Sequence, residues 1–196
     1  MKYLSKSFLY GILVFTIFSC GPEKRQNFTT LDDDGKIIIS NESIAILEKI
    51  QADYDHCKRS ETDEMECNQF TAKALCRFYE IEDFKKKDVF VSYREIKDVV
   101  TLNGGAWKAI GIATNQEDLI AAQLNANDTK ATIAFDPTKS NHVAIILPGE
   151  MSKSGAWGLE VPNSASFFVH KPESYINKGL SYSFSSPEGI ILYSKK

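Results

Sequence analysis

The chain has 196 residues, 43% of them hydrophobic and 25% charged, which is enough for one domain with a sizeable core. Removing residues 1–19 takes away two lysines and no acids, so 21 basic residues face 26 acidic ones and the net charge is −5. An acidic surface argues against nucleic acid or anionic lipid as the main partner.

The first segment has the pattern of an export signal. Two lysines precede the apolar run Phe8–Phe18, which is too short to span a bilayer. The run ends at Ser19-Cys20-Gly21, which resembles the lipobox of bacterial lipoproteins. The resemblance implies a signal peptide over residues 1–19 and a lipid on Cys20 that anchors the mature chain. An ordinary cleaved signal or an uncleaved short anchor would also export the domain.

The next segment, residues 20–40, is predicted to be a tether. It contains Pro22 and the polar run Asp32-Asp33-Asp34-Gly35. A domain over residues 41–196 follows, with Asn41 as the candidate N-cap of a helix that apolar spacing carries to about Asp55.

Three more helices are predicted before residue 128. Apolar spacing indicates a helix over residues 65–79. Ser92-Tyr93-Arg94-Glu95 matches a capping box and opens a helix that ends before Gly104. Thr114-Asn115-Gln116-Glu117 is a second match and opens a helix that continues through Leu124.

After Asp128 the pattern changes to that of strands. We predict strands at 131–135, 142–147, 158–161 and 165–169, and a final hairpin formed by 180–185 and 189–193. Helices come first and antiparallel strands second, which predicts an α+β fold rather than alternating βαβ units.

The cysteines of the domain allow more than one arrangement. Cys67 and Cys76 are nine positions apart, so on one helix they face opposite sides. Cys57 and Cys76 form a disulfide in one reading and are two free buried thiols in the other. A zinc site that combines these cysteines with His56 lacks a Cys-x-x-Cys step and is not expected.

Two short motifs carry the chemistry. Cys67-Asn68-Gln69 places a thiol where a helix begins, and the exposed N–H groups of a first helical turn lower a thiol pKa. His142-Val143-Ala144-Ile145 places an imidazole at the opening of a strand. A thiolate nucleophile and an imidazole base are what a cysteine hydrolase needs. His56 and His170 lack such a context.

These motifs resemble those of papain-like cell-wall hydrolases, the NlpC-type peptidases and CHAP-type amidohydrolases. The likeness covers about residues 45–196, although a Gly-Asp step that many relatives carry before the histidine strand is absent. The resemblance implies a papain-like α+β fold whose helical amino-terminal half packs on an antiparallel sheet. It also implies that Cys67 is the nucleophile and His142 the base, with no metal or organic cofactor.

The third catalytic residue is expected on the stretch after the histidine strand. Asn163 is our candidate, since its amide oxygen could accept from the imidazole ring. Ser164 and Ser154 are the next candidates, and Pro162-Asn163-Ser164 is also typical of a turn. The resemblance further suggests Tyr54 as a cleft residue, and the backbone N–H of Cys67 as an oxyanion donor.

The sequence therefore predicts a lipid-anchored cysteine hydrolase that cleaves amide bonds in peptidoglycan peptides. It would act in the bacterial cell envelope, facing the periplasm or the cell surface. One alternative is an inactive or inhibitory lipoprotein of the same fold that binds cell wall or a partner protein. Another is an amidase or acyltransferase of the same fold that acts on a different envelope substrate.

Overall fold

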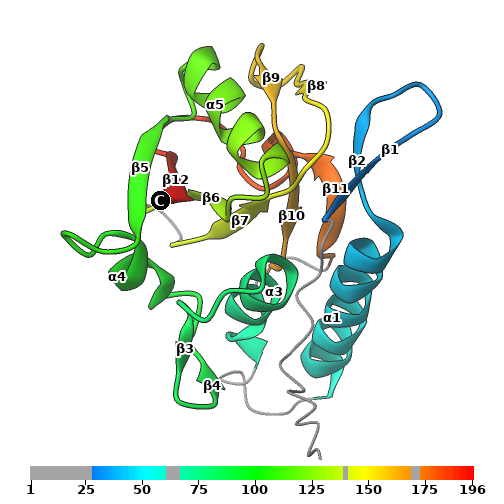
Figure 1. Ribbon diagram of the computed structural model, residues 1–196. Helices are drawn as coiled ribbons and strands as arrows, with labels where there is room; N and C mark the ends of the chain where they lie inside the picture. The colour runs from blue at the N-terminus through cyan, green and yellow to red at the C-terminus, as the bar shows by residue number, and fades with distance from the viewer. Residues whose placement is uncertain (1–27, 61–66, 139–140, 169–172) are drawn as a thin grey trace, which may run out of the picture.

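The computed structural model describes residues 28–60, 67–138, 141–168 and 173–196 (Figure 1). The predicted signal peptide, the predicted lipidation site Cys20, and His170 lie outside these ranges. Within the described ranges, no helix is long and apolar enough to cross a membrane.

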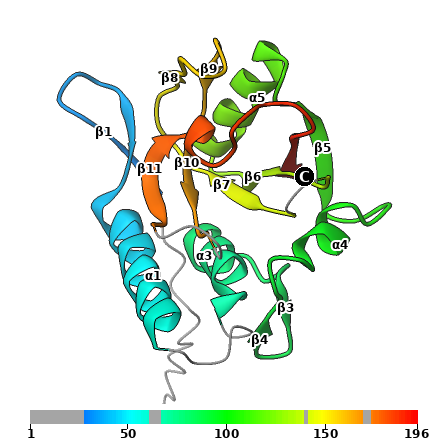
Figure 2. The same cartoon turned by 180° about the vertical axis from the view of Figure 1, so that it is seen from behind.

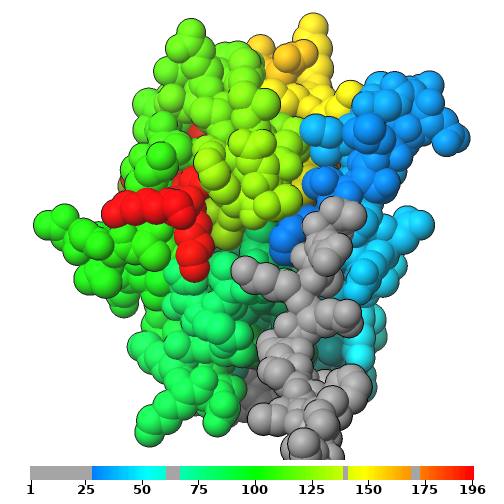
Figure 3. All heavy atoms as spheres, viewed as in Figure 1, coloured from blue at the N-terminus to red at the C-terminus, as the bar shows by residue number. Residues whose placement is uncertain are grey.

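Regular secondary structure begins within residues 20–40, the segment that was predicted to be a tether. Strands β1 (Thr29–Leu31) and β2 (Ile37–Ile39) form an antiparallel hairpin. The Asp32 carboxylate closes the turn by accepting two backbone N–H groups. Phe28, just before β1, packs on two aromatic rings of the domain, those of Phe78 and Tyr79. The second half of the predicted tether is therefore part of the folded body, and the hairpin stands at one corner of the space-filling view (Figure 3).

The helices follow the predicted order with shifted ends. Helix α1 spans Asn41–Arg59 and is capped by Ser40, whose side chain accepts from Ser43 N, so the cap lies one residue before the predicted Asn41. The remaining helices are α3 (Phe70–Tyr79), α4 (Ile96–Val100) and α5 (Gln116–Asn127). Asn115 caps α5, and the Glu95 carboxylate accepts from Ser92 N before the short α4.

A six-stranded antiparallel sheet forms the second layer, in the order β11-β10-β7-β6-β12-β5. Its strands are β5 (Trp107–Ile112), β6 (Thr132–Phe135), β7 (Val143–Ile146), β10 (Asn163–Ser166), β11 (Tyr175–Gly179) and β12 (Ile191–Lys195). Two small hairpins accompany it, formed by β3 (Lys85–Lys86) with β4 (Val89–Phe90) and by β8 (Ser152–Lys153) with β9 (Glu160–Val161). The prediction of an α+β fold is confirmed at this level.

The carboxyl-terminal hairpin prediction is wrong. Leu180–Tyr182 is a turn of 3-10 helix rather than a strand, and β12 pairs with β5 and β6 instead of with its neighbour in sequence. Strand β5 was not predicted.

The two faces of the sheet bury separate cores. Ile133, Phe135, Val143 and Ile145 pack with α1 and α3. Alternate residues on the same strands, such as Ala144 and Ile146, pack with α5. Figures 1 and 2 show α1 and α3 on one side of the sheet and α5 on the other.

Candidate functional site

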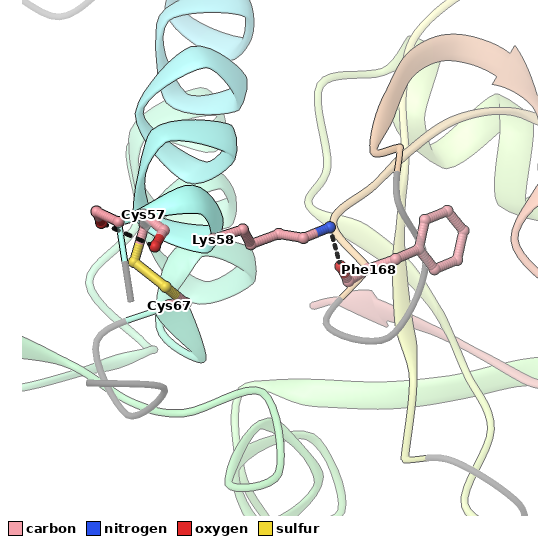
Figure 4. Close-up of a disulfide and its surroundings, with 5 residues drawn as sticks. Cys57, Lys58, Cys67 and Phe168 are labelled. Atoms are coloured by element: carbon pink, nitrogen blue, oxygen red, sulfur yellow. Dashed lines mark hydrogen bonds between the residues drawn. A yellow bond between two sulfur atoms is a disulfide. The ribbon is translucent and has the colours of Figure 1, made fainter. Parts of the chain in front are cut away.

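Cys67 is bonded to Cys57 in a disulfide (Figure 4). Cys57 lies in the last turn of α1, and Cys67 lies three residues before α3, so the bridge ties the end of one helix to the approach to the next. The open question of a Cys57–Cys76 bridge is thereby answered, because Cys76 is a free buried thiol. Burial raises the pKa of Cys76 to about 11.

The bridge changes what Cys67 can do. A sulfur in a disulfide has no proton to lose and cannot attack a carbonyl as a thiolate. Cys67 is also buried in the core between α1, α3 and the sheet. In this bridged form the predicted nucleophile is a structural residue.

His142 lies in a polar and aromatic cluster elsewhere on the sheet. Its Nε2 is 2.6 Å from Ser166 Oγ on the neighbouring strand β10. Its ring stacks on Phe168 with centroids 4.7 Å apart and meets Phe184 edge-on at 5.4 Å. Phe184 belongs to the core on the α5 side, so the imidazole lies on that face.

The structure does not bring Cys67 and His142 together. Val143, the next residue, packs in the same core as Cys67, and side chains alternate along a strand. Figure 4 shows the disulfide at one end of the Lys58 side chain and Phe168, on which His142 stacks, at the other. The predicted catalytic pair is therefore divided by the sheet.

Asn163 does not orient the imidazole, so that prediction is wrong. Its Nδ2 donates to Pro148 O at 2.8 Å and to Asn177 Oδ1 at 2.7 Å. Asn163 lies at the start of β10, and Ser166, three residues later, is the residue of this strand whose hydroxyl contacts the His142 ring.

The other candidate residues have structural partners. Ser164 Oγ is hydrogen-bonded to Tyr175 Oη and to Lys178 O, and Ser154 Oγ accepts from Trp157 N. Tyr54 is buried against Phe70 and Phe167, which raises its pKa, and its hydroxyl has no hydrogen-bond partner among the described residues.

A groove along edge strand β11 was missed by the sequence reasoning. It consists of three pockets that share residues. The first, of about 600 Å³, lies between β2, Pro148–Ser152 and β11; the second, about 330 Å³, continues between β11 and α1; the third, about 480 Å³, ends at Lys58 and Arg59. Ile44, Asn177 and Lys178 line both of the first two pockets. The asparagine and glycine of Asn177-Lys178-Gly179 were the sequence signal that could have indicated an irregular strand beside this groove.

The wall at β11 is shaped by a bulge. The register with β10 shifts between Ser164 and Ser166, and Asn177 has a positive φ of 61° within the shifted segment. The side chain of Asn177 accepts a hydrogen bond from Asn163 Nδ2. Gly149 packs against the side-chain amide of Asn163, and a Cβ at Gly149 would lie 2.9 Å from Asn163 Nδ2. The floor of the first pocket is therefore polar and tightly packed.

Charges of both signs line the groove. Lys36 and Glu150, which both line the first pocket, form an ion pair at 3.3 Å. Exposed Lys178 rests over the rings of Tyr175 and Tyr182. Exposed Glu48 faces the same groove from α1. Among the residues that the structure describes, no group of three or more metal-ligating side chains is present.

Comparison with known proteins identifies no relative. No family model matches the chain, and neither a curated protein nor a solved structure matches it.

Proposed function

We propose that this protein is an exported, membrane-anchored lipoprotein that binds a partner polypeptide in the groove beside β11. In this proposal Cys67 is a structural cysteine and the domain does not cut peptidoglycan. The observation that carries the proposal is the Cys57–Cys67 bridge, which removes the predicted nucleophile, together with its separation from His142.

The groove supports a binding role. Its first pocket lies in the size range of ligand sites, about 300–1,000 Å³, and combines isoleucine walls with convergent amides and charges. A disulfide also fits the predicted export, because disulfides persist in oxidising compartments outside the cytosol.

Two measurements test this function on the full chain purified in detergent. Immobilised protein is panned against a random library of displayed L-peptides, and selected peptides should lose binding to Lys178→Glu but retain it with Lys108→Glu, a matched exposed lysine on the opposite edge strand β5. Purified peptidoglycan is incubated with the protein, and mass spectrometry should find no released fragments. A library that yields no reproducible binder would overturn the proposal.

A cysteine hydrolase of the papain-like class is the second candidate. It is favoured by two buried oxygen atoms near the bridge, Tyr54 Oη and Asn68 Oδ1, which have no partner in the described parts of the chain. Unsatisfied buried polar atoms are rare, and a bound substrate or water would satisfy them. This candidate requires reduction of the bridge and movement of Cys67 to His142. It predicts peptidoglycan fragments only after reduction, and none from Cys67→Ser.

A further inference from the structure

Strand β11 ends the six-stranded sheet, and within the described residues no strand pairs with its outer edge. Leu180 N donates to Pro162 O at 2.8 Å, and Lys178 O accepts from Ser164 Oγ, so both residues are turned toward β10. In an antiparallel ladder the residues between such positions present their N–H and C=O groups to the other side. Gly179 therefore turns its backbone N–H and C=O groups away from β10, on the side of the first pocket, which it lines.

The chain just before β11 is already contacted by a side chain of α1. Ser174 O accepts from Gln51 Nε2 at 2.8 Å, so this backbone group is not available to an added strand. Across the first pocket, β2 belongs to a separate two-stranded sheet and pairs only with β1. The pocket therefore separates two strand edges, those of β2 and β11.

The charged side chains beside the first pocket also favour a polypeptide as its occupant. No carboxylate pairs with Lys178 and no cation pairs with Glu48 in the described ranges, although both line the groove from opposite walls. A ligand that carries an acid and a base a short distance apart would complement both. Repeated backbone donors and acceptors together with charges of both signs are properties of a polypeptide.

We propose that an extended segment of a partner polypeptide enters this pocket and adds to the edge of β11 as an extra strand. This inference rests on the proposed binding function and assigns its mode. The segment pairs its backbone with Gly179, places an acidic side chain at Lys178, and directs a basic side chain to Glu48.

Backbone pairing has a signature that charge attraction lacks. In an added strand, alternate N–H groups point to β11 and the others point away. The probe is a synthetic L-heptapeptide of alternating threonine and valine that carries one glutamate and one lysine, together with two derivatives N-methylated at alternate positions of opposite parity. Binding to the full chain in detergent is measured by fluorescence polarisation.

We expect one N-methylated derivative to lose at least about tenfold in affinity and the other to bind within about threefold of the parent. Lys178→Glu should weaken the parent roughly threefold to tenfold, and Lys108→Glu should leave it unchanged. Glu48→Lys combined with Lys178→Glu should favour a peptide whose two charged residues are exchanged.

The outcomes separate this inference from the binding function. Equal effects of the two methylation patterns would overturn strand addition, even where library selection still supports peptide binding. Failure of the heptapeptide and of every library-selected peptide to bind would overturn both. Binding that follows parity but ignores both charge reversals would retain strand addition and overturn the assigned charge contacts.

Discussion

The two faces of the six-stranded sheet differ in how many polar side chains they bury. The face toward α1 and α3 is almost entirely apolar and receives the Cys57–Cys67 bridge at its margin. The face toward α5 carries three polar side chains, those of His142, Ser164 and Ser166. His142 is hydrogen-bonded to Ser166, and Ser164 is hydrogen-bonded to Tyr175 and Lys178 of β11. Residues adjacent in sequence therefore serve different environments.

This difference explains why the cysteine motif and the histidine motif lie on opposite faces of the sheet. Val143 and Ile145 are required on the α3 side by the core, and strand alternation then sends His142 to the other side. A cysteine and a histidine in suitable sequence contexts are not sufficient for a catalytic pair.

The largest effect is expected from reversing the polarity of the α1/α3 face. Ile145→Asn removes a fully buried side chain and leaves an amide without a partner, which should destabilise the protein by at least about 3 kcal/mol in urea unfolding. Ile120→Asn, on the exposed side of α5, is the control and should cost less than about 1 kcal/mol. Similar costs for both would show that the face is not the tight core described here.

The next effect comes from the bridge at the margin of that face. Its cysteines are separated by 10 residues, and closing a loop of that size should stabilise the fold by about 2–3 kcal/mol. The double variant Cys57→Ser, Cys67→Ser should lower the melting temperature by roughly 5–10 °C in a calorimetric scan. The scan of the wild type with reductant should move by the same amount, and unchanged melting would indicate that the bridge is dispensable.

Thiol labelling distinguishes a structural Cys67 from a catalytic one. Without reductant, iodoacetamide should label neither Cys57 nor Cys67 at neutral pH, because both are oxidised. Cys76 has a raised pKa of about 11, so its thiol is neutral below that pH. Its labelling rate should rise about tenfold per pH unit up to about pH 11. Rapid labelling of Cys67 at pH 7 would support the hydrolase instead.

The smallest effect is expected on the polar face. Ser166→Ala removes the hydroxyl beside His142 Nε2 and should cost about 0.5–1.5 kcal/mol. The imidazole nitrogen resonance of His142 should shift in an NMR spectrum, while Thr101→Ala, which removes a hydroxyl that donates to Lys97 O at the end of α4, should leave it in place. An unshifted resonance would show that the pair is not formed in solution.

Local sequence signals predicted the local elements. The capping-box match Thr114-Asn115-Gln116-Glu117 marked the start of α5 to within one residue, since Asn115 is the cap, and the apolar runs at 131–135 and 142–147 marked β6 and β7. These features depend on residues close together in the chain, which is where capping and alternation rules apply.

The elements that were missed depend on distant partners. Strand β5, with Trp107 and Gly111, has weak alternation and forms because β12 pairs with it. Cys57 was expected to pair with Cys76 or to stay free, and the packing of α1 beside α3 brings it to Cys67 instead. The placement of His142 required the register of β7 in the sheet, which no local pattern specifies.

Strand β12 has a consequence for how the chain is made. It is the last strand in sequence, yet it lies between β6 and β5 in the interior of the sheet. Until Ile191–Lys195 emerges from the ribosome, β5 has no strand to pair with and the sheet lacks an inner member. Completion of the sheet therefore comes late in synthesis, after the residues of α1, α3, α4 and α5 have all been made.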